Sequence, residues 1–467
     1  MPHTSVTAPV ADPPAVQDTA ARVVLILSSL GFFLITLDIL IVNVALPSID
    51  RELGGGTTAQ QWVIDGYTLM FAALLLFAGN LADRVGAKRS FGVGIAVFLL
   101  ASAGCALAPT TGALIAARFV QGAAAAVMLP ATMALIRESF PDPRRRAHAL
   151  GIWAVGGAVA GAVGPLLGGL LTTVDWRWVF AINLPVCLAM LVLLRWVPTS
   201  PRRPSPFDWA GQVLAILGLS ALMFGLIEGG AVGFGSPIVI ISLAVAVVAL
   251  VGFVAVQARV RHPMMPLALF RPAGMRVALA VGFSFMAGWF GTVFFVSLYL
   301  QQQLGLPPLL AGLVFLPSAI AAMAGNLTSG AITNRWGPRV PVVSGLLLMV
   351  VGLTLLVITA PLGSPWLTAF VLVLIGPGGS IAMPAITSVV LDSVPAEQAG
   401  TASAVFNTFR QVGGAVAIAV FGAILAGATG FVTGLQVSLT IAAILLLVTA
   451  LISSVMIRPD RHARTTA

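Results

Sequence analysis

Two oppositely charged residues lie inside long apolar segments of this sequence. Asp38 occurs in the run GFFLITLDILIVNVALPS (31–48), and Arg118 occurs in the later segment RFVQGAAAA. A charge at the centre of a bilayer costs roughly 2.5–3.5 kcal/mol on insertion scales, so it normally faces a cavity or an opposite charge. Counted from Pro47 and from Thr110, both charges lie about 12–13 Å from the same end of their segments, at a rise of about 1.5 Å per residue. We therefore predict that Asp38 and Arg118 are partners.

An acid–base pair of this kind is suited to carrying a proton. A neighbouring guanidinium favours the ionised carboxylate, whereas removal from water favours the protonated form. A carboxyl group balanced between these effects changes its proton occupancy when its surroundings change. The alternative is a structural ion pair that holds the two helices together. The residues alone leave both readings open.

The composition places these charges in a membrane protein. The chain of 467 residues is 59% hydrophobic and only 8% charged, and its mean hydropathy is +1.04. Soluble domains contain about 25% charged residues. Apolar runs of about 20 residues recur along the whole chain, which excludes an oversized soluble core. Residues 1–21 are polar and rich in Pro, and we predict a disordered tail there rather than a signal peptide.

Fourteen segments are predicted to span the membrane, which gives an all-α polytopic protein. They are 22–46, 61–81, 91–108, 112–134, 148–171, 178–197, 208–228, 237–257, 277–300, 309–331, 340–360, 366–390, 401–425 and 435–457. With the N-terminus in the cytoplasm, the inside loops hold 20 of the 24 Lys and Arg residues. This asymmetry follows the positive-inside rule, so the basic residues orient the protein rather than bind nucleic acid. Both termini are then cytoplasmic.

An internal repeat divides the chain. GNLADRVGAK (79–88) follows the second span, GAITNRWGPR (330–339) follows the tenth, and both read G-x-x-x-[DN]-R-x-G-x-[KR]. Duplicated halves around a midplane site are typical of secondary transporters. We predict a 6+2+6 arrangement of spans. Its parts are a cytoplasmic tail 1–21, an N-terminal six-helix bundle 22–197, a linker with two extra spans 198–276, a C-terminal six-helix bundle 277–458 and a cytoplasmic tail 459–467.

Several motifs resemble the major facilitator superfamily, in particular its fourteen-helix drug:proton antiporter branch and the antibiotic-resistance exporters within it. They are LDILIVNVALP (37–47), GNLADRVGAKR (79–89), RFVQGAAAA (118–126), GAVGPLLGG (161–169), DWRWVFAINLPV (175–186) and NTFRQVGG (407–414). The resemblance covers essentially the whole chain after the first tail. It implies the major facilitator fold.

The resemblance also implies a function. We expect a proton-coupled antiporter in a bacterial cell membrane that exports hydrophobic or amphipathic drugs or antibiotics by alternating access, as a monomer. Protonation of Asp38 from outside would compete with the substrate, with Arg118 as its partner. A carrier for another small metabolite, working in export or uptake, is the alternative on the same scaffold. A non-transporting sensor is disfavoured because the sequence has no sizeable soluble segment.

Motifs that the sequence lacks argue against an ATP-driven pump, a metal site and an enzyme. The sequence has no G-x-x-x-x-G-K-[ST] phosphate loop, so ATP is not expected to supply the energy. None of the four histidines lies in the core of a span, so neither a histidine relay nor a metal site is indicated. No nucleophile–base pattern points to an enzyme. We expect no cofactor other than protons as the coupling ion.

Five further residues are candidates for proton or substrate contacts. Asp65, in QWVIDGYTL, is either a second protonation or cation-binding site at the extracellular mouth or a solvated residue of the vestibule. Asn43 is a candidate for a helix contact or a substrate hydrogen bond. Arg410, beside Asn407, either binds an anionic group or ties its helix to neighbours. Trp289, in an aromatic-rich span, either lines a hydrophobic cavity or packs against helices or lipid.

The repeated loop is a candidate gate. Its residues are Gly79, Asp83, Arg84, Gly86 and Lys88. A carboxylate such as Asp83 can sit against the positive N-terminal end of a helix. The resemblance implies that this helix is the thirteenth span, near Gln398–Thr401. The basic residues alone are also explained as a positive-inside anchor.

The fifth span carries small residues spaced for close packing. The motif residues are Gly161, Gly164, Pro165, Gly168 and Gly169. Steps of four place small residues on one helix face, which allows backbones to approach closely. Generic packing explains this pattern, and the resemblance implies that the face forms the seam between the two halves.

Overall fold

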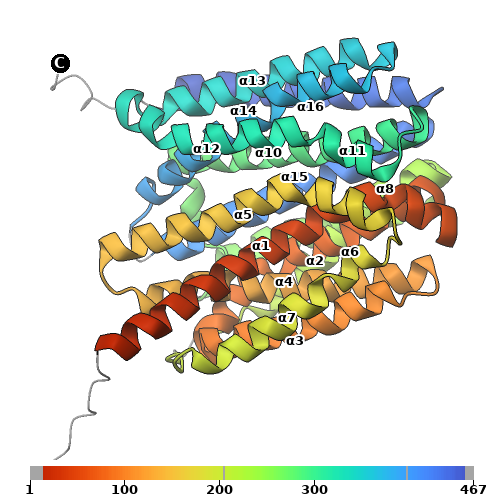
Figure 1. Cartoon of the computed structure of the whole chain (residues 1–467). Helices are drawn as coiled ribbons and strands as arrows, with labels where there is room; N and C mark the ends of the chain where they lie inside the picture. The colour runs from red at the N-terminus through yellow and green to blue at the C-terminus, as the bar shows by residue number, and fades with distance from the viewer. Residues whose placement is uncertain (1–13, 203–205, 396–397, 458–467) are drawn as a thin grey trace, which may run out of the picture.

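The computed structural model describes residues 14–202, 206–395 and 398–457, and within these ranges the chain forms helices and connecting loops without strands. Fourteen helical segments are long and apolar enough to cross a membrane, as predicted. Helices satisfy every backbone N–H and C=O within the segment, which the hydrocarbon interior requires. The long axes run roughly parallel, with α12, α13, α14 and α16 on one side of the molecule and α3, α4 and α7 on the other (Figure 1).

The first six spans contain seven helices, because the sixth span is divided. They are α1 (Pro14–Leu53), α2 (Gly56–Val85), α3 (Ala87–Ala106), α4 (Thr111–Ser139), α5 (Pro143–Thr172), α6 (Trp178–Ala181) and α7 (Asn183–Leu193). The division of the sixth span places Asn183 at the first position of α7.

The remaining eight spans are formed by α8 to α16 together with one π-helical turn. They are α8 (Trp209–Val232), α9 (Pro237–Arg259), α10 (Ala273–Leu298), a π-helical turn (Tyr299–Gln303), α11 (Pro308–Val314), α12 (Leu316–Trp336), α13 (Arg339–Thr359), α14 (Pro365–Asp392), α15 (Ala399–Gly427) and α16 (Phe431–Met456). The helices α11 and α12 together form the tenth span, and the π-helical turn extends α10.

The first helix begins earlier than predicted. Residues 14–21, which were assigned to a disordered tail, form the first turns of α1. The stretch contains three alanines and a glutamine, which are good helix formers, so the helix continues beyond the apolar span. Residues 1–13 and the predicted tail 459–467 lie outside the described residues.

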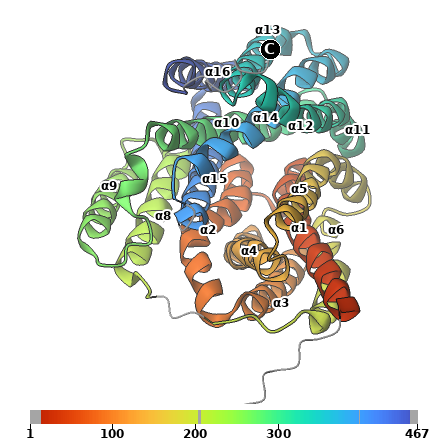
Figure 2. The ribbon, with the colours of Figure 1, turned by 90° about the vertical axis from the view of Figure 1, so that its left-hand side faces the viewer.

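The helices pack as two bundles with two extra helices beside them. Within the first bundle α1 packs on α5 and α4 packs on α2 and α3, whereas in the second α10 packs on α15, and α14 on α12 and α13. The extra helices α8 and α9 pack on each other, and α8 also contacts α2 and α15 (Figure 2). These contacts are those expected for a 6+2+6 division, and the exact division stays a prediction.

Exposed tryptophans mark the two ends of the bundle. We call the end where α2 meets α3 the basic end, and the end where α1 meets α2 the opposite end. Trp178 and Trp366 are exposed towards the opposite end, and Trp196, Trp209 and Trp336 towards the basic end. Tryptophan is enriched at both membrane–water interfaces, so these rings outline the depth of the bilayer.

The two bundles touch near the opposite end. The side chain of Gln61, on α2, donates to the backbone oxygen of Ile418 on α15 at 3.0 Å. The hydroxyl of Ser297, on α10, donates to the backbone oxygen of Asn43 on α1 at 2.9 Å. Side chains of each half thus satisfy backbone oxygens of the other and seal this end.

The small residues of α5 serve two different contacts. Gly164 and Gly168 face α1, where a Cβ on Gly168 would clash with the backbone oxygen of Ile41. Gly169 faces the other half, and its Cβ would lie 2.5 Å from the backbone oxygen of Pro308 on α11. Only part of the motif therefore lies at the seam between the halves. The rest holds α5 against α1 within the first bundle.

The bundles separate towards the basic end. A Cβ placed on Gly161, two turns from Gly169 along α5, would meet no atom within 4 Å. The same holds for Gly79 near the end of α2 and for Gly400 at the start of α15. The halves are therefore in contact at the opposite end and apart at the basic end.

This difference between the two ends of α5 can be measured. We expect Gly169→Ala to lower the free energy of unfolding by about 1–3 kcal/mol, because the added methyl overpacks a backbone contact. The matched change Gly161→Ala enters open space and removes a helical glycine, so it should be neutral or stabilising by up to about 1 kcal/mol. Thermal unfolding of both variants in detergent tests this. Equal effects of the two substitutions would contradict the assigned seam.

Candidate functional site

The predicted ion pair is present and completely buried. Nη1 of Arg118, on α4, donates to Oδ2 of Asp38, on α1. Both side chains are 0% exposed. A buried charge pair is tolerated only when further hydrogen bonds satisfy the remaining donors and acceptors. The role of the pair in proton coupling stays a prediction.

Three further polar side chains complete a cluster around Asp38. Gln121 Nε2 and Asn183 Nδ2 both donate to Asp38 Oδ1, at 2.8 and 2.9 Å. The same two amides also contact the Ser102 hydroxyl oxygen, at 2.9 and 3.3 Å. We call Asp38, Ser102, Arg118, Gln121 and Asn183 the Asp38 cluster. It joins α1, α3, α4 and α7, and each member is at most 1% exposed.

The Arg118 guanidinium is held by more than its carboxylate. Its Nε donates to the backbone oxygen of Val63 on α2 at 2.8 Å, and Nη1 also contacts Gln121 Oε1 at 2.7 Å. Its central carbon lies 4.5 Å from the ring centroid of Tyr67 and 5.8 Å from that of Phe180. Cation–π contacts of this kind strengthen when water is absent. Movement of Arg118 is therefore coupled to α2 and α6 as well as to α1.

The cluster is built for an ionised carboxylate. All three side chains that contact the Asp38 oxygens present N–H donors to it. A proton on Asp38 would face donors, so at least one of these contacts would have to break. Asn183 Oδ1 is buried and has no hydrogen-bond partner. Rotation of this amide would present an acceptor to a protonated Asp38.

Sequence reasoning missed three members of the cluster. Gln121 lies one helical turn after Arg118 inside the motif RFVQG, and Asn183 lies inside the motif INLPV. Both are amides within apolar spans, which was a usable signal. Ser102 carries no such signal, because serine is common in membrane helices and bonds readily to its own backbone.

Of the two alternatives for Asp65, the solvated residue of the vestibule does not agree with the structure. The Asp65 side chain is 0% exposed. The reason is that α2 begins at Gly56 rather than at residue 61, so Asp65 lies nine residues into the helix, about 13 Å from its start. Oδ1 accepts from the Thr68 hydroxyl at 3.2 Å, and Oδ2 is buried without a partner. Its proposed role as a protonation site stays a prediction.

Asp65 lies beside the contact between the two halves. Trp62 and Leu69, three residues before it and four after it, pack against an apolar cluster that includes Met223 of α8 and Ala415 of α15. Residues three and four apart share one helix face, so Asp65 lies on the face of α2 that meets α8 and α15.

The remaining candidates divide between the two bundles. Asn43 donates to the backbone oxygen of Ile39 at 3.0 Å, so its amide is bonded within α1 and its backbone forms the contact with α10. Trp289 is half-buried on α10. Arg410 donates from Nη1 to Asn407 Oδ1 at 3.1 Å, on α15.

The loop motif contacts its own bundle in this arrangement. Asp83 accepts from Arg137 Nη2, on α4, at 3.3 Å, with both side chains about half exposed. The sequence expectation placed Asp83 near the start of α15, but Gly79 and Gly400 both face open space. The separation of the halves at the basic end is the reason for this difference.

The same loop also secures the connection to α8. Lys88 Nζ donates to the backbone oxygen of Val197, and Lys88 N donates to the Ser200 hydroxyl at 3.0 Å. That hydroxyl donates to Glu138 at 2.6 Å. Gly86 has φ +97°, and a Cβ there would lie 3.2 Å from the Ser200 backbone oxygen, so a larger residue is disfavoured. Gly86 and Lys88 thus anchor the segment that leads into the extra helices.

Arg84 adds a stacking contact to this anchor. Its guanidinium lies 4.8 Å from the ring centroid of Phe207, just before α8. Phe207 also stacks on Phe77 of α2, with ring centroids 4.9 Å apart. The start of α8 is therefore fixed to the end of α2.

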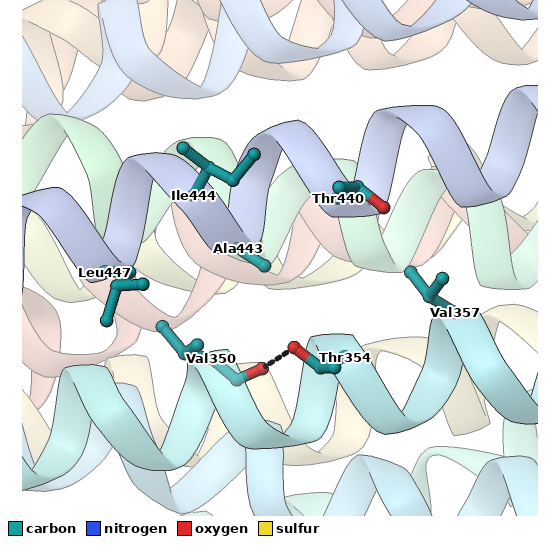
Figure 3. A pocket seen from close by; sticks show the side chains of 7 residues that line it. All are labelled: Val350, Thr354, Val357, Thr440, Ala443, Ile444 and Leu447. Carbon is teal, nitrogen blue, oxygen red and sulfur yellow. Dashed lines mark hydrogen bonds between the residues drawn. The ribbon is translucent and has the colours of Figure 1, made fainter.

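A groove on the surface of the second bundle offers no such chemistry. A groove of about 160 Å³ lies between α13 and α16 (Figure 3). Its two threonines, Thr354 and Thr440, donate to backbone oxygens of their own helices. Ile444 on its rim is 55% exposed, as suits a surface that faces lipid. Among the described residues no group of three or more His, Cys, Asp or Glu side chains forms a metal site.

Comparison with known proteins agrees with the resemblance carried by the motifs. The model of a family described as the Major Facilitator Superfamily matches residues 28–418. A methylenomycin A resistance protein of Streptomyces coelicolor is 35% identical, and the alignment covers 97% of this chain and 96% of that protein. The puromycin resistance protein pur8 of Streptomyces alboniger is 38% identical, with 91% and 89% covered.

Solved structures show the same fold at much lower identity. A POT family transporter in complex with a thioalcohol-conjugated peptide matches with a TM-score of 0.69 at 14% identity, covering 94% of this chain and 97% of that one. A D-xylose-proton symporter matches with a TM-score of 0.66 at 14% identity, covering 94% and 98%. At these identities the likeness shows the fold alone, and it confirms the predicted fold.

The contribution of Asn183 to the cluster can be isolated with a double-mutant cycle. We expect Asn183→Leu to lower the free energy of unfolding by about 1.5–3 kcal/mol, since it removes a donor to a buried charge. In an Asp38→Asn background the same substitution should cost clearly less, because the charge has gone. Denaturant titration of the four proteins in detergent measures the coupling. Additive effects would show that Asn183 does not stabilise the ionised Asp38.

Proposed function

Because the chain belongs to the Major Facilitator Superfamily, we propose that it is a proton-coupled antiporter that exports hydrophobic or amphipathic drugs or antibiotics. Its curated relatives, named for resistance to methylenomycin A and puromycin, support export of antibiotics from a bacterial cell. The observation that carries the proton coupling is the buried Asp38 cluster. An ionisable group inside a membrane span is a functional site by default, because it is expensive to keep there.

Protonation of Asp38 would release the helices that the cluster holds together. The ionised carboxylate accepts from Arg118, Gln121 and Asn183, which belong to α4 and α7. Neutralising it weakens these charge-assisted hydrogen bonds and frees α1 to move. Asn43, five residues or about 7.5 Å further along α1, forms the contact with α10. A proton at Asp38 can therefore alter the seal at the opposite end.

Asp65 is a second candidate proton carrier in this proposal. It is fully buried, and its Oδ2 has no partner. An isolated ionised carboxylate in such surroundings is costly, so Asp65 suits the neutral acid while the halves are in contact. Opening of the contact between α2 and α15 would expose Asp65 to water and allow it to exchange its proton.

Alternating access follows from the two ends of the bundle. The positive-inside rule places the basic end and both termini in the cytoplasm. The described arrangement is then open to the cytoplasm and sealed towards the outside. In the reverse state the halves close at the basic end, and Asp83 exchanges Arg137 for the start of α15, where a helix N-terminus favours a carboxylate.

The proposed domains take separate roles in this cycle. The bundles 22–197 and 277–458 rock against each other. Meanwhile α8, in the segment 198–276, packs on both α2 and α15 and covers their contact at the periphery of the molecule. Glu228 on α8 accepts from Trp62 Nε1, on α2, at 3.1 Å, which supports this placement. The protein acts in the lipid bilayer as a monomer and needs neither nucleic acid nor a cofactor beyond protons.

A carrier for another small metabolite uses the same geometry. Uptake and export differ in the direction in which the substrate moves relative to the protons. The Asp38 cluster would be the same in both. Counterflow measured in vesicles of defined orientation separates these two functions.

The proton-coupling proposal is tested by Asp38→Asn. We expect loss of drug resistance in an efflux-deficient host and at least a roughly tenfold fall in transport driven by a pH gradient, because the proton carrier has been removed. The control is Asp392→Asn at the exposed end of α14, which should transport as the wild type does. Full proton-driven transport by Asp38→Asn would falsify this mechanism.

A further inference from the structure

Arg410 is a charge in the middle of a span that has no counter-charge. Four charged residues lie well inside the spans, namely Asp38, Asp65, Arg118 and Arg410. Arg118 is paired with Asp38, whereas none of the ion pairs in the described chain includes Arg410. Arg410 lies eleven residues, or about 16 Å, from the start of α15. Its neighbours are the Phe406 ring, whose centroid lies 5.8 Å from the guanidinium carbon, and the Asn407 amide, neither of which carries a negative charge. A guanidinium at this depth normally faces a cavity or a partner.

One edge of the Arg410 guanidinium is free of protein partners. Its hydrogen bond within the described chain runs from Nη1 to Asn407 Oδ1 at 3.1 Å, and Nε is buried without a partner. Asn407 is itself fixed, because its amide donates to the backbone oxygen of Ser403 at 3.0 Å. Among the described residues, the Nε–Nη2 edge therefore makes no hydrogen bond. That edge matches two oxygens of a carboxylate, sulfonate or phosphate in a bidentate contact.

A second unpartnered group lies on the same face of α15. Gln411 is only 7% exposed, and its Oε1 is buried without a hydrogen-bond partner. Residues three and four apart share a helix face, so Asn407 is adjacent to both Arg410 and Gln411. This polar face has more hydrogen-bonding capacity than its protein surroundings use.

The stem of Arg410 is fixed against α10. A Cβ on Gly282 of α10 would lie 2.9 Å from Arg410 Cγ, so the stem packs closely on α10. The residue as a whole is only half-buried. Phe285 and Trp289 follow Gly282 at the third and seventh positions along α10, and both are half-buried. A charged group at Arg410 would thus have aromatic surface beside it on the same helix face.

The acidic residues offer no matching site for cations. Asp38 and Asp65 are both 0% exposed, and Asp38 already accepts three hydrogen bonds from protein side chains. The remaining carboxylates lie in loops or near the ends of spans. A lipophilic cation would find no accessible carboxylate at the depth of Arg410.

We infer that this transporter binds amphipathic anions, with a carboxylate, sulfonate or phosphate group seated on the Nε–Nη2 edge of Arg410 and the hydrophobic body along α10. The inference rests on the proposed function in that the bound anion is the exported cargo. The inference assigns proton coupling to one bundle and substrate recognition to the other. The first bundle carries the proton on Asp38, and the second recognises the substrate through Arg410.

Binding to the full chain in lipid nanodiscs tests this without a proton gradient. The anionic probe is 1-anilinonaphthalene-8-sulfonate, and N-phenyl-1-naphthylamine provides the same aromatic body without the sulfonate. Empty nanodiscs supply the blank. We expect Arg410→Met to weaken binding of the sulfonate at least about tenfold, because a charged hydrogen-bonding partner is lost. Binding of the neutral probe should stay within about twofold.

Two matched variants separate charge from shape. Arg410→Lys keeps the charge without the planar fork, so its affinity for the sulfonate should lie between those of the wild type and Arg410→Met. Arg335→Met, at the exposed end of α12, should bind both probes as the wild type does. Unchanged binding of the neutral probe also shows that each variant is folded.

Three results would overturn the inference. They are sulfonate binding that is unchanged in Arg410→Met, equal loss of both probes, and tighter binding of tetraphenylphosphonium than of the sulfonate. None of them depends on proton coupling. Conversely, an Asp38→Asn variant that transported normally would refute the proposed coupling and leave the binding result intact.

Discussion

The buried charge of Asp38 is the constraint on which the first bundle depends. An ion pair removed from water gains less than its desolvation costs unless other groups complete it. Here the completing groups are Gln121 and Asn183, which reach the same carboxylate oxygen from α4 and α7. The helices of this bundle are therefore held together by a contact that a single proton can weaken. Under the proposed coupling, stability and proton transfer would depend on the same hydrogen bonds.

In the second bundle the charge inside a span, Arg410, is in none of the ion pairs of the described chain. Arg410 has one amide partner and a cation–π contact with Phe406, and its Nε is buried without a hydrogen-bond partner. The contact between the halves includes small residues and side-chain bonds to backbone oxygens, such as Gln61 to Ile418, beside an apolar cluster that contains Trp62 and Leu69. Few large side chains have to leave their partners when such a contact opens. The Asp38 cluster and Arg410 thus lie in different bundles, on either side of the contact between the halves.

Regular helix geometry explains what could be predicted. Depth along a helix grows by about 1.5 Å per residue, so the common depth of Asp38 and Arg118 followed from counting. The burial of Asp65 did not follow from the predicted span, because α2 starts five residues before that span and so places Asp65 deeper in the helix. Ser102 was missed because its role arises where α3 meets α4 and α7, which no local pattern records.

The amino-acid sequence by itself determined the membrane class, the fourteen spans, the repeat and the charged residues inside the spans. These follow from hydrophobicity and helical periodicity, which act along the chain. Only the tertiary structure decided which polar groups meet. It closed the Asp38 carboxylate within donors from several helices and left the Arg410 edge free, because hydrogen-bond partners are chosen by packing between helices far apart in sequence.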